Sequence, residues 1–295
     1  MRVHESYESE TWGKIHEPAH IQEVLDEIEK NFPKYFTSFW KPPKKRMQAI
    51  QSAIEDFLKR QPKYADFLDV ESLEEYEFDP GAFKTGMKTE LPIIQGALFS
   101  QDQAMKQYKA SFYAAKGMDL LSTTKNIIDF AVDYMADFDD EYHELLETVA
   151  DFERSKLQEP EFFSSGVIGE GIKAHFLYSL HPNAFPNRGQ NAIWSLYFLT
   201  SKKEFDFLDG SEFLMIDAKK GIIQQNYLYP YDLFSLYALK IYLILKQAAG
   251  EKGYPFTESY RYIYLDHFFG HIAQVHQDDI SVYKTTSEDS DYGFH

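Results

Sequence analysis

Apolar residues recur every three or four positions over most of this 295-residue chain, which is the pattern of helices that bury one face. The first such run begins at Pro18, because proline is favoured at the first helical position, and we expect Pro33 to end it. A second run covers 44–60 and is expected to stop at Pro62. The same spacing predicts further helices over 101–157 with a break at Gly117, and over 170–180, 190–200, 231–249 and 259–276.

Three stretches depart from this helical spacing and indicate extended backbone. Residues 212–217 and 222–229 have the composition of strands and are joined by Ala-Lys-Lys-Gly, which predicts an antiparallel hairpin near 212–229. Residues 91–94 predict a short extended segment. The fold class that follows is mostly α (α+β), a multi-helix domain with one antiparallel β-hairpin, rather than a parallel α/β sheet.

Turn-forming residues between the early and the later helices suggest a boundary. The stretch 62–100 contains acidic and turn-forming segments, among them Asp79-Pro-Gly81. We therefore expect an N-terminal helical subdomain over 1–90 and a main helical domain with the β-hairpin over 91–295. A chain of this length is sufficient for one large domain or two ordinary ones.

The composition of the chain indicates a large apolar core and a strongly negative net charge. Apolar residues make up 44% of the chain and aromatic residues 17%, which excludes a disordered class. The formal net charge of −17 disfavours general binding of nucleic acid, leaving only a local basic groove. The one dense basic run, Lys41–Arg46, is interpreted as a solvated linker or as a contact to a phosphate or a partner.

The absence of cysteine excludes disulfides, thiolate zinc sites and a cysteine nucleophile, and a reducing cytosol fits it best. The polar N-terminus lacks the apolar stretch of a signal peptide, and no run approaches 18 apolar residues. We therefore expect a cytoplasmic protein without a membrane partner.

Two histidine motifs raise the question of a metal. His16-Glu-Pro-Ala-His20 matches the zinc-protease pattern, but Pro18 starts the helix inside it and removes the shared helical face that the metal needs. A second group consists of Asp266, His267, His271 and His276, in which His267 and His271 are one helical turn apart. These four residues are candidate ligands of Zn²⁺ or Mg²⁺/Mn²⁺; alternatively they form the polar side of an otherwise buried helix.

The loop between the helices at 170–180 and 190–200 is dense in hydrogen-bonding groups. Over nine residues, His181-Pro-Asn-Ala-Phe-Pro-Asn-Arg-Gly resembles the loop of the Fic family of AMP-transferases. The acidic metal ligand of that family is absent and its arginine is displaced by one position, so the resemblance does not imply the activity. What the residues themselves predict is an anion site at a helix start, with the candidates His181, Asn187, Arg188 and Gln190, or simply an interhelical loop.

The predicted hairpin carries a possible nuclease motif. Asp209 and Asp217-Ala-Lys219 resemble the motif of the PD-(D/E)xK nuclease superfamily, with Glu212 as an alternative acid. The resemblance implies two carboxylates on a divalent cation and a lysine that stabilises charge. The competing interpretation is that Asp-Ala-Lys-Lys-Gly is an ordinary exposed hairpin turn.

No complete catalytic constellation emerges from these motifs. We therefore expect an intracellular, non-enzymatic interaction or regulatory module with a protein partner and no cofactor other than a divalent cation. The segment Tyr254–Tyr264, with four tyrosines in eleven residues, is the expected contact face. The alternative function is a metal-dependent nuclease or phosphodiesterase that uses Asp209, Asp217 and Lys219.

Overall fold

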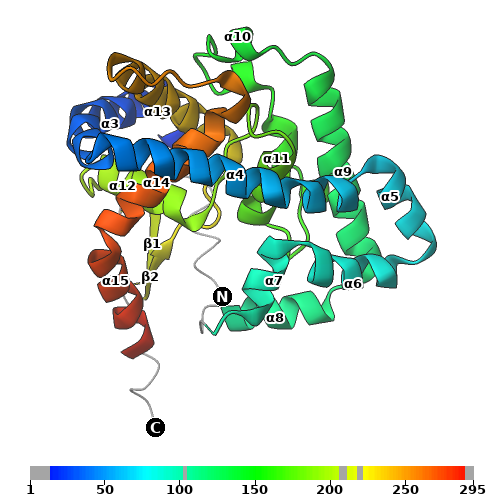
Figure 1. Cartoon of the computed structure of the whole chain (residues 1–295). Helices are drawn as coiled ribbons and strands as arrows, with labels where there is room; N and C mark the ends of the chain where they lie inside the picture. The colour runs from blue at the N-terminus through cyan, green and yellow to red at the C-terminus, as the bar shows by residue number, and fades with distance from the viewer. Residues whose placement is uncertain (1–13, 102–104, 206–210, 218–221, 290–295) are drawn as a thin grey trace.

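The computed structural model describes residues 14–101, 105–205, 211–217 and 222–289, and within them it confirms a mostly α fold with one antiparallel two-stranded sheet (Figure 1). The helices are α3 (Pro18–Phe39), α4 (Pro43–Phe67), α5 (Val70–Glu75), α6 (Pro80–Glu90), α7 (Pro92–Phe99), α8 (Met105–Ala114), α9 (Gly117–Ala136), α10 (Asp140–His143), α11 (Glu170–Leu180), α12 (Gln190–Leu199), α13 (Tyr231–Glu251), α14 (Arg261–Val275) and α15 (Gln277–Asp289). The strands are β1 (Leu214–Asp217) and β2 (Ile222–Gln225), and short 3₁₀ turns occupy Tyr76–Phe78, Ala150–Phe152, Ser155–Gln158, Pro160–Phe162 and Glu258–Tyr260.

Helices α12, α13 and α14 form the centre of the molecule. Helix α13 is apolar around most of its circumference, and nearly all of its first fifteen residues are buried. Helix α14 packs against both α12 and α13, and α3 covers all three. None of the described helices is long and apolar enough to cross a membrane.

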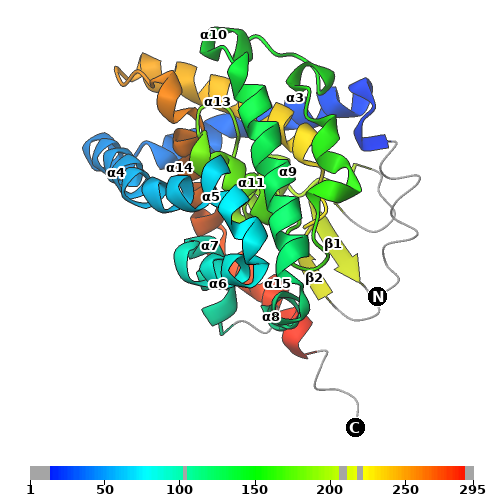
Figure 2. The same cartoon turned by 90° about the vertical axis from the view of Figure 1, so that its right-hand side faces the viewer.

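Helix α4 connects this centre to a second group of helices (Figure 1). It lies against α14 and α11, and it also contacts α5 and α6. Helices α5 and α6 pack on the long helix α9, as the turned view shows (Figure 2). One continuous cluster of buried apolar side chains includes Phe32 of α3, Ile54 of α4 and Phe268 of α14, so α3 and α4 share a core with the C-terminal half. The predicted division at residue 90 stays a prediction.

Two helices run through prolines that were expected to end them. Pro33 lies inside α3 and Pro62 lies inside α4, so the predicted ends are wrong. A proline inside a helix costs about 3 kcal/mol through one lost hydrogen bond and a steric clash. The apolar face continues beyond each proline, with buried Phe36 and Phe39 in α3 and buried Phe67 in α4. Burial of these aromatic rings offsets that cost.

The predicted extended segment at 91–94 is also wrong. Leu91 alone is extended, as the residue before α7, and Pro92 takes the first helical position. The helix predicted through 145–152 is not formed either, because between α10 and α11 the chain forms turns and short 3₁₀ segments instead of an α-helix. The predicted break at Gly117 is confirmed, since α9 begins there.

The hairpin is confirmed in a shorter form than predicted. Leu214 pairs with Gln225 and Asp217 with Ile222 in an antiparallel register. Glu212 precedes β1 rather than lying in it. Helix α15 packs against β2, and α12 contacts both strands, which places the hairpin beside the helical centre.

The close contact between α6 and α9 gives a stability prediction. A Cβ added at Gly117 would lie 2.0 Å from the carbonyl oxygen of Pro80, and this oxygen cannot move without shifting the backbone of α6. We expect Gly117→Ala to destabilise the fold by about 2 kcal/mol or more in urea unfolding. Gly96→Ala is the control, because exposed Gly96 lies inside α7 with no atom near its Cβ position. It should gain about 0.5–1 kcal/mol, and equal effects of the two substitutions would contradict this account.

Candidate functional site

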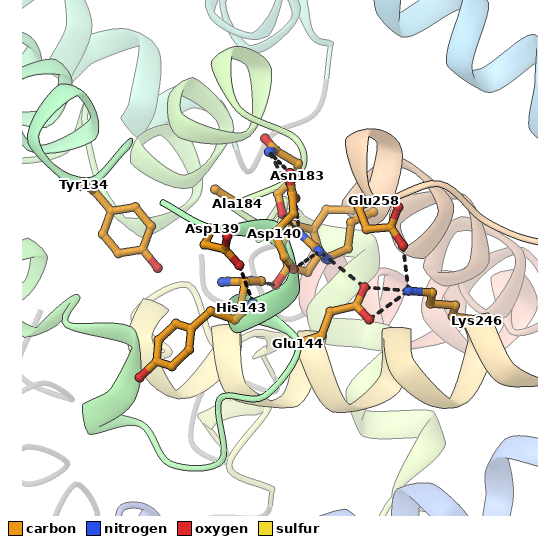
Figure 3. Close-up of polar contacts among 12 residues, drawn as sticks. Tyr134, Asp139, Asp140, His143, Glu144, Asn183, Ala184, Lys246 and Glu258 are labelled. Atoms are coloured by element: carbon orange, nitrogen blue, oxygen red, sulfur yellow. Dashed lines mark hydrogen bonds and ion pairs between the residues drawn. The ribbon is translucent and has the colours of Figure 1, made fainter. Parts of the chain in front are cut away.

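The loop His181–Gly189 is held by buried arginine side chains, the first of which is Arg261. Its guanidinium is fully buried, bonds Asp140 at 3.1 Å and donates to the carbonyl of Asn183. Glu144 accepts from Arg261 at 3.3 Å and from Lys246 at 2.8 Å. Figure 3 shows Lys246 reaching both Glu144 and Glu258 while Asn183 lies beside Asp140. These contacts fix α10 and the start of the loop against α13 and α14.

The second arginine is Arg154, which lies among aromatic rings and has no ion pair with any described carboxylate. One terminal nitrogen donates to the hydroxyl of Ser235 at 2.8 Å, and the other donates to the carbonyl of Ala184 at 2.7 Å. The guanidinium carbon lies 4.6 Å from the ring centre of Phe185 and 5.1 Å from that of Tyr134. The negative faces of aromatic rings replace part of the hydration that this buried cation has lost.

Two further donors complete the fixation of the loop. The backbone N–H of Tyr262 donates to the carbonyl of Pro182 at 3.0 Å, and the hydroxyl of Tyr231 donates to the carbonyl of Pro186 at 3.0 Å. Four carbonyls of this loop therefore have a partner from another part of the chain. The last turn of the loop is rigidly placed as a result, and it carries the side chain of Asn187 to the interface of α4, α11 and α14.

A polar cavity of about 100 Å³ lies at this interface. Its lining residues are Phe57, Arg60, Gln61 and Tyr64 of α4, His175, Tyr178 and Ser179 of α11, Asn187 of the loop, and Asp266 of α14. A single water needs roughly 10–15 Å³ by a comparable measure, so several waters or one small ligand fit.

One wall of the cavity is a hydrogen-bond chain with a defined direction. The hydroxyl of Tyr64 accepts from the backbone N–H of Ile93 at 3.1 Å, so its own proton points to His175 Nε2 at 3.0 Å. His175 is therefore protonated on Nδ1, which faces Asn187 Oδ1 at 3.4 Å. Asn187 Nδ2 then donates to Asp266 Oδ1 at 2.9 Å. Every donor points towards Asp266, so this carboxylate is the terminal acceptor of the chain.

Burial sets the protonation of this chain. It raises the pKa of Asp266 to about 6, although the bond from Asn187 and the charge of Arg60 act against the shift. Burial lowers the pKa of His175 to about 4 and raises that of Tyr64 to about 12. At neutral pH the site therefore holds one carboxylate, a neutral imidazole and a neutral phenol.

Several groups in the cavity have hydrogen-bonding capacity that no described residue uses. They are Asp266 Oδ2, the hydroxyls of Tyr178 and Ser179, and the two terminal amino groups of Arg60. The Nε of Arg60 donates to the backbone carbonyl of Asp56 at 3.0 Å. These groups line the cavity, where they can bond water or a polar ligand. The cavity is therefore equipped to bind a polar molecule.

The four residues predicted as metal ligands do not converge. Asp266 faces the cavity, whereas His267 Nε2 accepts from Arg46 at 2.9 Å. His271 uses Nε2 on Ser38, and His276 bonds Tyr35 and Asp279. Burial together with the Arg46 charge lowers the pKa of His267 and His271 to about 4, so both are neutral. Among the described residues no group of three His, Asp or Glu side chains could hold a metal ion.

The predicted anion site is dispersed as well. Arg188 is buried and donates to the carbonyl of Asn226 at 2.6 Å, His181 is half-buried, and Gln190 is exposed. Of this group only Asn187 reaches the cavity, where it meets Asp266 from the predicted metal group.

The nuclease motif lies largely outside the described residues. This applies to Asp209, Lys219 and the side chain of Asp217, so a shared cation there stays a prediction. Glu212 is described, and it is buried with one carboxylate oxygen bonded to His20 and the other accepting from Tyr229 at 2.6 Å. These partners make Glu212 a link between α3 and the segment that follows the hairpin.

The predicted contact face at Tyr254–Tyr264 is wrong for two of its four tyrosines. Tyr262 and Tyr264 are buried in the core, and Tyr254 and Tyr260 are partly buried. Arg46, from the basic run, stacks on Phe39 with its guanidinium carbon 4.1 Å from the ring centre. This arginine contributes to the packing of α3 against α14 rather than lying in a solvated linker.

The residues that sequence reasoning missed are those on α4 and α11. Tyr64 and His175 are 111 positions apart, and each occupies an ordinary place in an amphipathic helix. Nothing in the local pattern distinguishes them from core residues, since only the crossing of α4 over α11 brings them together.

The fold and the site define a mostly helical protein with a small polar cavity at the crossing of three helices. Comparison with protein-family models, curated proteins and solved structures finds no match for this chain. Its function is therefore inferred from the geometry of the cavity itself.

The raised pKa of Asp266 predicts a stability change when the charge is removed. An unfolded aspartate has a pKa near 3.9, so ionisation destabilises the folded state between about pH 4 and pH 6 and the full penalty remains above that range. We expect Asp266→Asn to stabilise the protein by about 1–3 kcal/mol at pH 7 and to have no effect at pH 4. The asparagine keeps an oxygen that can accept from Asn187.

The measurement is urea unfolding at both pH values. Asp129→Asn is the control, because Asp129 is an exposed aspartate on α9 and its substitution should change little at either pH. A loss of stability in Asp266→Asn at pH 7 would show that the folded protein benefits from the charge, contrary to this account.

Proposed function

We propose that this chain is a non-enzymatic binding protein whose functional site is the cavity between α4, α11 and α14, and that it takes up a small polar ligand there. The observation that carries the proposal is the set of unused hydrogen-bonding groups around Asp266, which share one cavity with aromatic side chains. Convergent polar groups beside aromatic walls, together with a shifted pKa, are typical of ligand-binding sites.

The arrangement of His175 makes it a positioning group rather than a general base. Both of its ring nitrogens are engaged within the protein, with Tyr64 on one side and Asn187 on the other. A general base needs a free lone pair within reach of the substrate, and His175 offers none to the cavity. Its role in the proposal is to orient Asn187 and, through it, the carboxylate of Asp266.

We further propose a regulatory role in the cytoplasm with a protein partner, in which α4 is the helix through which ligand binding acts. Helix α4 supplies four of the cavity residues and contacts both the central helices and the α5–α6 group. A ligand that bridges α4 to α14 would restrict the motion between these groups of helices. We propose that a protein partner recognises this restricted state.

Binding to the cavity can be tested before the ligand is known. Ligand-observed NMR at pH 7.5 with pools of amino acids, amines, organic acids and polyols is expected to detect at least one compound that binds. Ser179→Leu replaces the hydroxyl with three carbon atoms at the cavity wall and should abolish that signal by occupying about the space of the ligand. Ser52→Leu makes the same change at an exposed position of α4 and should leave binding intact. Absence of any binder, or equal binding by Ser179→Leu, would refute the proposal.

A further inference from the structure

We propose that the ligand of this cavity is a small zwitterion, with an ammonium group on Asp266 and a carboxylate on Arg60. This inference rests on the proposed function and specifies the ligand class. It follows from three features of the cavity: the direction of the hydrogen-bond chain, the position of Arg60, and the walls between the two charges.

The first feature is that the inner end of the cavity accepts hydrogen bonds. The protons of Tyr64, His175 and one amide N–H of Asn187 are all used along the chain. Asp266 Oδ2 remains, and a carboxylate oxygen can only accept. A ligand group placed there must therefore donate, and a charged N–H donor makes the strongest such bond.

The second feature is a cation at the outer end. Arg60 lies one helical turn before Tyr64 on α4, so it occupies the same face of that helix. It is exposed, and its two terminal amino groups bond no described residue. It lines the cavity together with His175 and Asp266. A guanidinium with two free amino groups matches a carboxylate in a bidentate manner.

The third feature is the surface between the two charges. Phe57 and Tyr178 contribute aromatic side chains, and their rings contact each other with centres 5.2 Å apart. These walls suit a short aliphatic spacer, and they lower the local dielectric so that both charge pairs are strengthened. The small volume limits the spacer to a few carbon atoms. Small amino acids meet all of these conditions.

The test compares five small probes that carry both charges, only one of them, or neither. Glycine and β-alanine carry both charges, ethylammonium carries only the positive charge, propionate only the negative charge, and acetamide neither. Dissociation constants from NMR titration at pH 7.5 are expected to be lowest for a zwitterion, with ethylammonium weaker and propionate and acetamide weakest.

Two variants test which residue binds the ammonium group of the ligand and which binds its carboxylate. Asp266→Asn should weaken zwitterion and ethylammonium binding by about ten-fold or more, since it removes the charged acceptor. Arg60→Gln should weaken the probes that carry a carboxylate, by about three-fold because Arg60 is exposed to solvent, and should not weaken ethylammonium. Lys63→Gln removes the same charge from an exposed position on α4 outside the cavity and should change neither.

The outcomes distinguish the inference from the function on which it rests. If propionate or acetamide binds most tightly and Ser179→Leu abolishes this binding, the cavity remains a binding site but the proposal of a zwitterionic ligand is overturned. If the wild-type protein binds a zwitterion and ethylammonium equally well, Arg60 does not contribute to binding, and the inference is overturned. Failure of all five probes and of the wider pools to bind would overturn both proposals.

Discussion

The rest of the structure depends on two buried guanidinium groups. Arg154 and Arg261 have almost no contact with solvent, and each donates to a backbone carbonyl of the loop between α11 and α12. Burying a cation is expensive unless its donors are satisfied and its charge is compensated. The charge of Arg261 is compensated by Asp140 and Glu144, and that of Arg154 by aromatic faces and neutral acceptors. The terminal nitrogens of both arginines donate, whereas the Nε of each has no partner among the described residues. The outcome is a loop without regular structure that is nevertheless fixed.

That fixed loop is what allows a polar cavity to exist inside a helical protein. Asn187 is held at the point where α4, α11 and α14 meet, so a hydrogen-bond chain can end at a carboxylate that is largely removed from water. Such a carboxylate costs stability, and its raised pKa is a measure of the cost. Proteins retain costs of this kind at sites where a ligand can compensate for them.

Much of the fold could be predicted from local patterns, whereas the site could be predicted only in fragments. The ranges of α11 and α13 and the presence of the hairpin follow from apolar spacing and turn residues. The helix ends at Pro33 and Pro62 were mispredicted, because a local rule was outweighed by the burial of aromatic residues farther along each helix. Asn187 and Asp266 were selected from the sequence as members of two different motifs, an anion loop and a metal group. Their actual relation is a hydrogen bond to each other.

The sequence by itself determined the class of the protein: helical periodicity, one hairpin, a large aromatic core, strong negative charge and the absence of thiol chemistry. These properties depend on residue type and near neighbours, so they can be read along the chain. Only the tertiary structure decided which polar side chains meet, because Tyr64, His175, Asn187 and Asp266 lie on segments separated by up to about two hundred positions. Their contact depends on how helices cross, and crossing is set by the summed packing of many apolar side chains rather than by any motif.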